Sequence, residues 1–211
     1  MIVLVESNFV IEFAQRQAEI ADAERIVALA EDREIELAIP ACALFEPYET
    51  LIRRRKQRTE TVRKLIDEIA QLGRSQHFAD LPATSAPIYQ VLYGAAEVEH
   101  RALDDALVRL ANCATVIPLS GTMLKSSLDA RRRFSLPPQD SIVFTSVEHF
   151  LRDRTGTESV FANKNSADFS GPEMETYFAQ LGCKLFASFS NTRQYIESMV
   201  RRTGSKRDIH I

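Results

Sequence analysis

Four consecutive aliphatic residues near the start of the chain, Ile2 to Val5, are followed at once by Glu6, Ser7 and Asn8. A short apolar run bounded by polar residues is typical of a strand that is buried on both faces of a parallel sheet. In an open α/β sheet, ligands bind just outside the carboxyl ends of the strands. The pattern therefore predicts that Glu6 lies at the sheet edge where a functional site forms.

Short apolar runs alternate with helical patterns along the rest of the chain. Further strands are predicted at 35–39, 159–162 and 183–187, and 116–119 is another short apolar segment. Helices are predicted at 8–14, 17–30, 41–72, 86–113, 120–133, 140–150, 172–181 and 191–201. Because strands alternate with helices, we expect an α/β fold with a central parallel sheet of about four to five short strands flanked by helices.

The predicted helices also carry expectations about packing and domain organisation. We expect one domain over residues 1–211, with a helical insertion at about 74–113 and a basic tail at about 202–211. The polar stretch 53–58 predicts a bend or break in the long helix. Helical spacing predicts an inward-facing set on each of two helices. These residues are Leu44, Phe45, Leu51 and Ile52 on the first helix, and Met123, Leu124 and Leu128 on the second.

Composition places the chain among soluble globular proteins. Apolar residues make up 45% and charged residues 26%, and the net charge of -3 does not by itself point to nucleic acid, although a local basic patch is sufficient for binding it. The three cysteines are far apart, and we expect them to be reduced core thiols. The first five residues are too short for a signal-peptide core, and no apolar run approaches the ~20 residues of a membrane span. We therefore expect a cytoplasmic protein with no membrane association.

Four acidic residues are predicted to lie at strand ends or in the loops and helix starts that follow them. They are Glu6, Glu46, Asp140 and Asp168. An α/β protein forms its binding site at such positions. If the four carboxylates converge, Mg²⁺ or Mn²⁺, which prefer oxygen ligands, offset the repulsion between them. Taken singly, each acid is also typical of a helix cap or a solvated surface group.

The order and surroundings of these acids resemble the PIN-domain family of metal-dependent ribonucleases. That family opens with a strand, an acid, Ser or Thr, and Asn, here Val5-Glu6-Ser7-Asn8. Its second acid, usually Glu, lies early in the helix after the second strand, as Glu46 does. Its third opens a helix after a linker with Pro or Gly, as in Pro137-Pro138-Gln139-Asp140, and its fourth ends a segment in Asp-Phe, here Asp168-Phe169. The resemblance spans residues 1 to about 187.

The resemblance implies a three-layer PIN-like fold and a metal-dependent endoribonuclease. Glu6, Glu46, Asp140 and Asp168 would be both metal ligands and catalytic residues, holding one or two Mg²⁺ or Mn²⁺ ions that activate water against an RNA phosphodiester. Ser7, Asn8, Asn163 and Asn165 would support them, while Ser7 and Asn8 also fit a helix N-cap. The family further implies a toxin of a toxin–antitoxin system or an RNA-processing enzyme. The implied partners are RNA, an antitoxin or other protein, and a second copy in a homodimer.

The chain departs from the family at two of these positions. Glu6 stands where the family usually has Asp, and Asn165 stands where many relatives carry another acid. The extra methylene of Glu6 matters because Mg²⁺ demands near-ideal octahedral geometry. Two alternatives therefore stay open beside catalysis. The first is a degenerate PIN-like protein that binds RNA or protein, and the second is a partner-dependent interaction module whose acidic cluster is structural.

Basic residues near the predicted site are candidates for RNA phosphate contacts. Arg53 opens an Arg-Arg-Arg-Lys run two turns after Glu46 on the same helix face, and Arg131 opens another run just before the Asp140 linker. Lys164 lies in the loop that leads to Asp168. Phosphate binding beside an acidic metal site needs such local cations. Solvated helix faces are the alternative interpretation of both basic runs.

Overall fold

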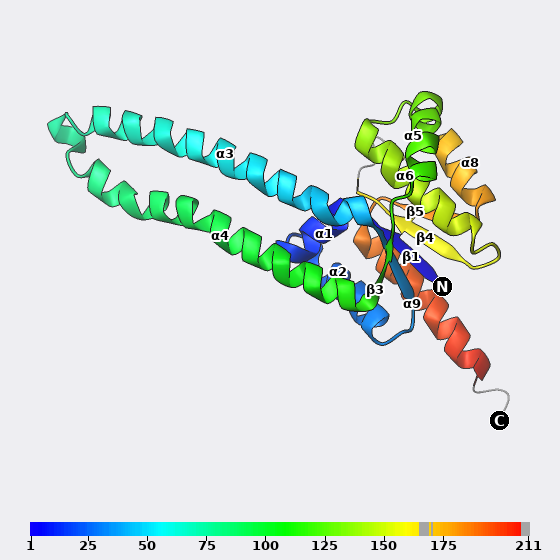
Figure 1. Ribbon diagram of the computed structural model, residues 1–211. Helices are drawn as coiled ribbons and strands as arrows, with labels where there is room; N and C mark the ends of the chain where they lie inside the picture. The colour runs from blue at the N-terminus through cyan, green and yellow to red at the C-terminus, as the bar shows by residue number, and fades with distance from the viewer. Residues whose placement is uncertain (165–168, 170, 208–211) are drawn as a thin grey trace.

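The computed structural model describes residues 1–164, 169 and 171–207, with side chains described up to residue 202. Within these residues, five parallel strands form one sheet in the order β3-β2-β1-β4-β5. The strands are β1 (Ile2–Val5), β2 (Glu36–Pro40), β3 (Ala114–Ile117), β4 (Ser159–Ala162) and β5 (Cys183–Phe186). The predicted α/β class with a parallel sheet flanked by helices is therefore confirmed (Figure 1).

Helices cover both faces of the sheet. Helices α1 (Ser7–Ala14), α2 (Ile20–Glu31) and α9 (Phe189–Arg207) lie on one face, and α5 (Gly121–Phe134), α6 (Pro138–Arg152) and α8 (Pro172–Gln180) lie on the other (Figure 1). β1 contributes to both cores because alternate residues of a strand point to opposite faces. Val3 and Val5 join the core of the first face, whereas Ile2 and Leu4 join that of the second. This double burial explains why the strand is apolar at every position.

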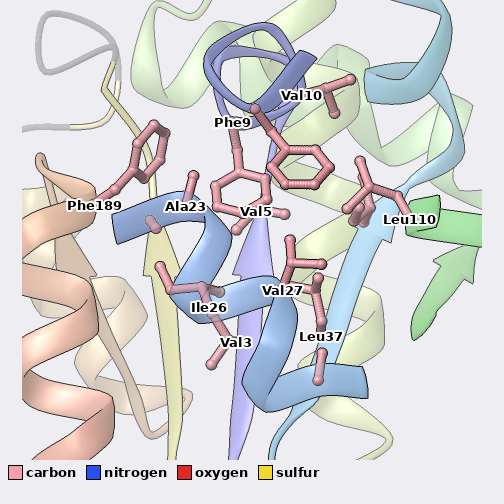
Figure 2. Packing of buried hydrophobic residues seen from close by; sticks show 14 of the residues in the cluster. Val3, Val5, Phe9, Val10, Ala23, Ile26, Val27, Leu37, Leu110 and Phe189 are labelled. Carbon is pink, nitrogen blue, oxygen red and sulfur yellow. The ribbon is translucent and has the colours of Figure 1, made fainter. Parts of the chain in front are cut away.

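The core of the first face is built around the aromatic residues of α1 and α9. Phe9 and Phe189 are fully buried, and their rings meet edge to face with centroids 5.1 Å apart. Figure 2 shows these two rings above Val5, with Val27 of α2 and Leu37 of β2 below them. This packing fixes α1, and therefore its first residues, against the carboxyl end of β1.

Two long helices form an antiparallel hairpin that projects from the domain (Figure 1). They are α3 (Ala41–Leu72) and α4 (Leu81–Cys113), and the short 3-10 helix η1 (Gln76–Phe78) lies between them. At 1.5 Å per residue, the 32 residues of α3 span about 48 Å. The base of the hairpin packs against α1, whereas its far end extends beyond the sheet and its covering helices.

The hairpin and its neighbours overturn several predictions about packing. The expected bend or break at 53–58 is wrong, because α3 is continuous from Ala41 to Leu72. Phe45 and Ile52 were predicted to face the core, but they are 68% and 55% exposed. Only the base of the hairpin meets the domain, so most of α3 has no core to face. On α5, Leu124 and Leu128 are also exposed, and the small residues Ser127 and Ala130 are buried instead.

Element boundaries differ from prediction in several places, and α4, for example, begins at Leu81 rather than at 86. The apolar segment at 116–119 belongs to a strand that begins earlier, β3, which pairs in parallel with β2. α9 continues to Arg207, through part of the region predicted as a basic tail. Cys42, Cys113 and Cys183 are free as expected, but only Cys183 is buried, whereas Cys42 and Cys113 are half-buried. No helix in the described residues combines the length and apolar character needed to cross a bilayer.

Candidate acidic site at the carboxyl edge of the sheet

Glu6 lies directly between the central strand and the helix that follows it. It is the N-cap residue of α1 and has extended backbone angles, with φ -131° and ψ -168°. Its carbonyl oxygen accepts a hydrogen bond from the backbone N–H of Phe9 at 3.0 Å. Since β1 is flanked by β2 and β4, the chain segments that leave these three strands emerge beside Glu6. The predicted position at the sheet edge is confirmed.

The side chain of Glu6 is buried, with only 5% of its surface exposed. The Ser7 hydroxyl donates a hydrogen bond to Oε2 at 2.8 Å. The other oxygen, Oε1, is buried and has no hydrogen-bond partner within the described part of the chain. Burial raises the pKa of Glu6 to about 7, the bonds from Ser7 and Asn8 act in the opposite direction, and the charge of Glu46 raises it further. A buried carboxylate with one unsatisfied oxygen favours a nearby cation.

Glu46 is the second predicted acid, and the structure brings it near Glu6. Pro40 ends β2 and serves as the N-cap of α3, which places Glu46 in the second turn of the helix. Its charge raises the pKa of Glu6 and also that of Cys42, whose pKa is raised to about 11 mainly by burial. The charge of Glu46 therefore acts on Glu6, as the smallest of the influences on its pKa, and a shared site for the two acids stays a prediction.

Asp140 lies in the first turn of α6, at the same edge of the sheet. The far end of α6, at Arg152, lies at the amino edge, because Arg154 just beyond it pairs with Glu36 at the start of β2 at 3.7 Å. A helix of 15 residues is about 22 Å long, so its first turn lies at the opposite, carboxyl edge. α6 also packs against β2 and α3, the elements that lead to Glu46.

Two of the predicted site residues, Asn165 and Asp168, lie outside the described residues. Among the residues that are described, no three His, Cys, Asp or Glu side chains form a group able to hold a metal ion. The structure therefore joins Glu6 and Glu46 electrostatically and places Asp140 at the same edge without grouping it with them as a three-ligand site. The position of the fourth acid stays a prediction.

The first two residues after β4, Asn163 and Lys164, are held by hydrogen bonds and ion pairs. Asn163 is buried, and its backbone N–H donates to the carbonyl of Phe186 in β5 at 2.9 Å. Lys164 donates to Oε2 of Glu12 at 2.8 Å and lies 3.0 Å from Oε1 of Glu19. Glu12 is 2% exposed, so the ammonium of Lys164 neutralises a buried carboxylate on α1. The predicted phosphate contact by Lys164 would have to compete with these two ion pairs.

Sequence reasoning missed Glu12 and Glu19. Neither residue stands in a motif, and their partner Lys164 is more than a hundred positions away in the chain. Glu19 also accepts hydrogen bonds from the backbone N–H groups of Phe189 and Ser190 at the start of α9. The available sequence signal was weak, namely one Glu within the otherwise apolar helix 8–14.

The two predicted arginine contacts are on the surface. Arg53 on α3 and Arg131 on α5 are exposed, and neither forms an ion pair with another described residue. By contrast, Arg109 binds both Glu24 and Glu31 at 2.8 and 2.7 Å. Both predicted contacts are thus available to a ligand, although exposure alone does not define a site.

The described carboxylates fit a hard divalent cation in their chemistry. Mg²⁺ and Mn²⁺ take carboxylate oxygens as ligands, and Glu6 Oε1 is a buried oxygen without a hydrogen bond beside a second carboxylate. Glu6 and Glu46 are the described residues that would hold such an ion, whereas Asp140 lies in the first turn of α6 and is not grouped with them. No protein-family model, no curated protein and no solved structure matches this chain.

Proposed function

We propose that this chain is a PIN-like, metal-dependent endoribonuclease whose site contains Glu6, Glu46, Asp140 and Asp168. The observation that carries the proposal is the buried Glu6 carboxylate at the carboxyl edge of the sheet, which has one unsatisfied oxygen and whose pKa is raised in part by the charge of Glu46. The order of the acids along the chain and the five-stranded parallel sheet are consistent with it. Asp168 enters by its place in the sequence alone.

The chain's own residues have separate tasks in this proposal. Bound Mg²⁺ or Mn²⁺ would supply an activated water and would stabilise charge on the phosphate oxygens. Ser7 fixes the orientation of Glu6 through the hydrogen bond to Oε2, which leaves Oε1 available to a cation. The burial of Glu6 keeps competing water from this oxygen. Asp140, in the first turn of α6, would complete the acidic set from the opposite face of the sheet at the same carboxyl edge.

The proposal extends to the biological setting only through the resemblance. A toxin of a toxin–antitoxin system or an RNA-processing enzyme is the expected context, with RNA as substrate and an antitoxin or a second copy of the chain as protein partner. A second candidate function is a degenerate PIN-like protein that binds RNA or protein without cleavage. The observation that favours it is Glu6 itself, which is longer than Asp and has a pKa of about 7 when no metal is bound.

Cleavage of a mixed single-stranded RNA tests the proposal. The purified protein is incubated with the RNA in Mn²⁺, in Mg²⁺ and in chelator. We expect cleavage with metal only, and we expect Asp140→Asn to abolish it. Asp153→Asn is the matched control, because Asp153 is an exposed residue at the other end of the same helix. RNA binding without cleavage under every condition would favour the degenerate relative, and neither binding nor cleavage would favour a structural acidic cluster.

A further inference from the structure

The positive charge of this chain is concentrated on one part of α3. Residues 53–64 contain seven Arg or Lys and a single Glu, a net charge of +6. The whole chain has a net charge of -3, so the remaining residues together carry -9. Such an asymmetry is typical of a surface that binds a polyanion.

Most of these cations have no partner within the described part of the chain. Arg58 binds Glu99 at 2.7 Å and thereby ties α3 to α4. The other six are exposed and form no ion pair with a described residue. They are Arg53, Arg54, Arg55, Lys56, Arg63 and Lys64. Like charges three or four positions apart destabilise a helix, so an anionic ligand would relieve a cost that the free protein bears.

The basic segment is aligned with the acidic site. Lys64 follows Glu46 by 18 residues, which is five helical turns, so both side chains leave α3 on the same face. Arg53 lies on this face as well, about 10 Å from Glu46 along the axis, and Lys64 lies about 27 Å away. Figure 1 shows that α3 runs from the sheet edge outward along the projecting hairpin. An extended ligand that enters the site would therefore pass along these cations.

The composition of the segment favours a phosphate backbone over a protein partner. The centre of a protein interface is apolar and poor in charge. Between residues 53 and 64, Val62 is the aliphatic residue and it is buried, although the exposed Ile52 and Leu65 flank the segment. Arg, which matches phosphate geometry with two parallel hydrogen bonds, supplies four of the six unpaired cations.

We propose that residues 53–64 of α3 are an RNA-binding arm that holds the phosphate backbone of the substrate beside the acidic site. The proposal rests on the ribonuclease function proposed above, and it adds that affinity for RNA comes largely from outside the acidic cluster. At about 3.4 Å per stacked nucleotide, the 27 Å between Glu46 and Lys64 corresponds to about eight nucleotides. Tight binding should therefore need RNA of more than about eight nucleotides.

Binding of a fluorescent 20-nucleotide single-stranded RNA in chelator separates the arm from cleavage. We expect the triple variant Arg53→Gln, Lys56→Gln, Lys64→Gln to weaken binding about tenfold at low salt. The slope of log affinity against log salt should fall by about 2, since each neutralised phosphate of a single strand contributes about 0.7. The matched control, Arg33→Gln, Arg74→Gln, Arg202→Gln, removes the same charge at exposed positions outside the segment and should leave the slope unchanged.

Removal of a negative charge from the segment and an independent cleavage assay complete the test. Glu60 is exposed and is the one acid in the segment, so Glu60→Gln should strengthen RNA binding. The arm is refuted if the wild-type protein does not bind this RNA, or if the two triple variants bind it equally well. Metal-dependent cleavage with equal binding would refute the arm and leave the ribonuclease standing. RNA binding that depends on the arm, without cleavage in any metal, would support the arm and refute the ribonuclease. Competition by an acidic protein but not by RNA would assign the arm to a protein partner.

Discussion

The buried carboxylate of Glu6 makes the metal-free protein less stable as the pH rises. The pKa of Glu6 is about 7 in the folded chain against 4.5 for a free side chain, so the folded state binds the proton more tightly. Folding is favoured most below pH 4.5, and this stability is lost as the pH rises from there through 7. A difference of about 2.5 pKa units corresponds to about 3 kcal/mol at 1.36 kcal/mol per unit.

Glu6→Gln tests this reasoning because Gln keeps the size of the side chain and cannot ionise. In chelator, we expect the variant to exceed the wild type in unfolding free energy by about 3 kcal/mol at pH 8. Near pH 5 the ionisation part of this difference should shrink to less than about 1 kcal/mol. Urea unfolding followed by circular dichroism at both pH values measures it, with the slope m checked for constancy.

The decisive quantity is how much the unfolding free-energy difference between Glu6→Gln and the wild type changes from pH 5 to pH 8. Any effect of the amide that does not depend on pH is the same at both values and cancels. An unfolding free-energy difference that is the same at both pH values would refute the conclusion that Glu6 is desolvated. Adding Mn²⁺ at pH 8 provides a second readout. A ligand that binds only the folded state stabilises it, so the wild type should gain more from the metal than Glu6→Gln does.

Two further substitutions test the packing around the site. Lys164→Met removes the cation from Glu12, which is 2% exposed, and should lower the unfolding free energy by about 3 kcal/mol. Lys164→Arg keeps the positive charge and should lower it clearly less in the same urea titration. Phe9→Ala removes a fully buried ring from the core of the first face and should cost about 3–5 kcal/mol, and a loss below 1 kcal/mol would contradict the packing of α1 on β1.

The parts of the fold that sequence predicted well are those where burial is complete. Ile2 to Val5 are apolar at every position because β1 lies between two strands and is covered on both faces. β4 is buried at all four positions for the same reason. Pro40 correctly predicted the end of β2, and the helix predicted from Asp140 begins slightly earlier, at Pro138, since proline favours the first turn of a helix.

The predictions that failed concern elements whose burial depends on which other element packs against them. Helical spacing gives Phe45 and Ile52 a common face, but it does not reveal that this face of α3 is exposed to solvent. β3 is an edge strand whose middle residues are exposed, so its pattern is weak, and it follows α4 without an intervening turn. Periodicity reports an amphipathic element, whereas the identity of its partner is a property of the tertiary fold.

Some features of the candidate acidic site could likewise be predicted from the sequence, and others required the structure. The sequence identified Glu6 and Glu46 by their positions after strands, but the environment that raises the pKa of Glu6 arises only when α1 packs on β1. The bond between Lys164 and Glu12 had only a weak sequence signal, yet it fixes the exit of β4 against α1, the helix that carries Ser7 and Asn8. The chain that leaves β4 therefore starts from a position set by the same helix that orients Glu6. For that reason, a substitution at Lys164 should disturb the acidic site even though its side chain points to carboxylates on the far part of α1 and on the segment before α2.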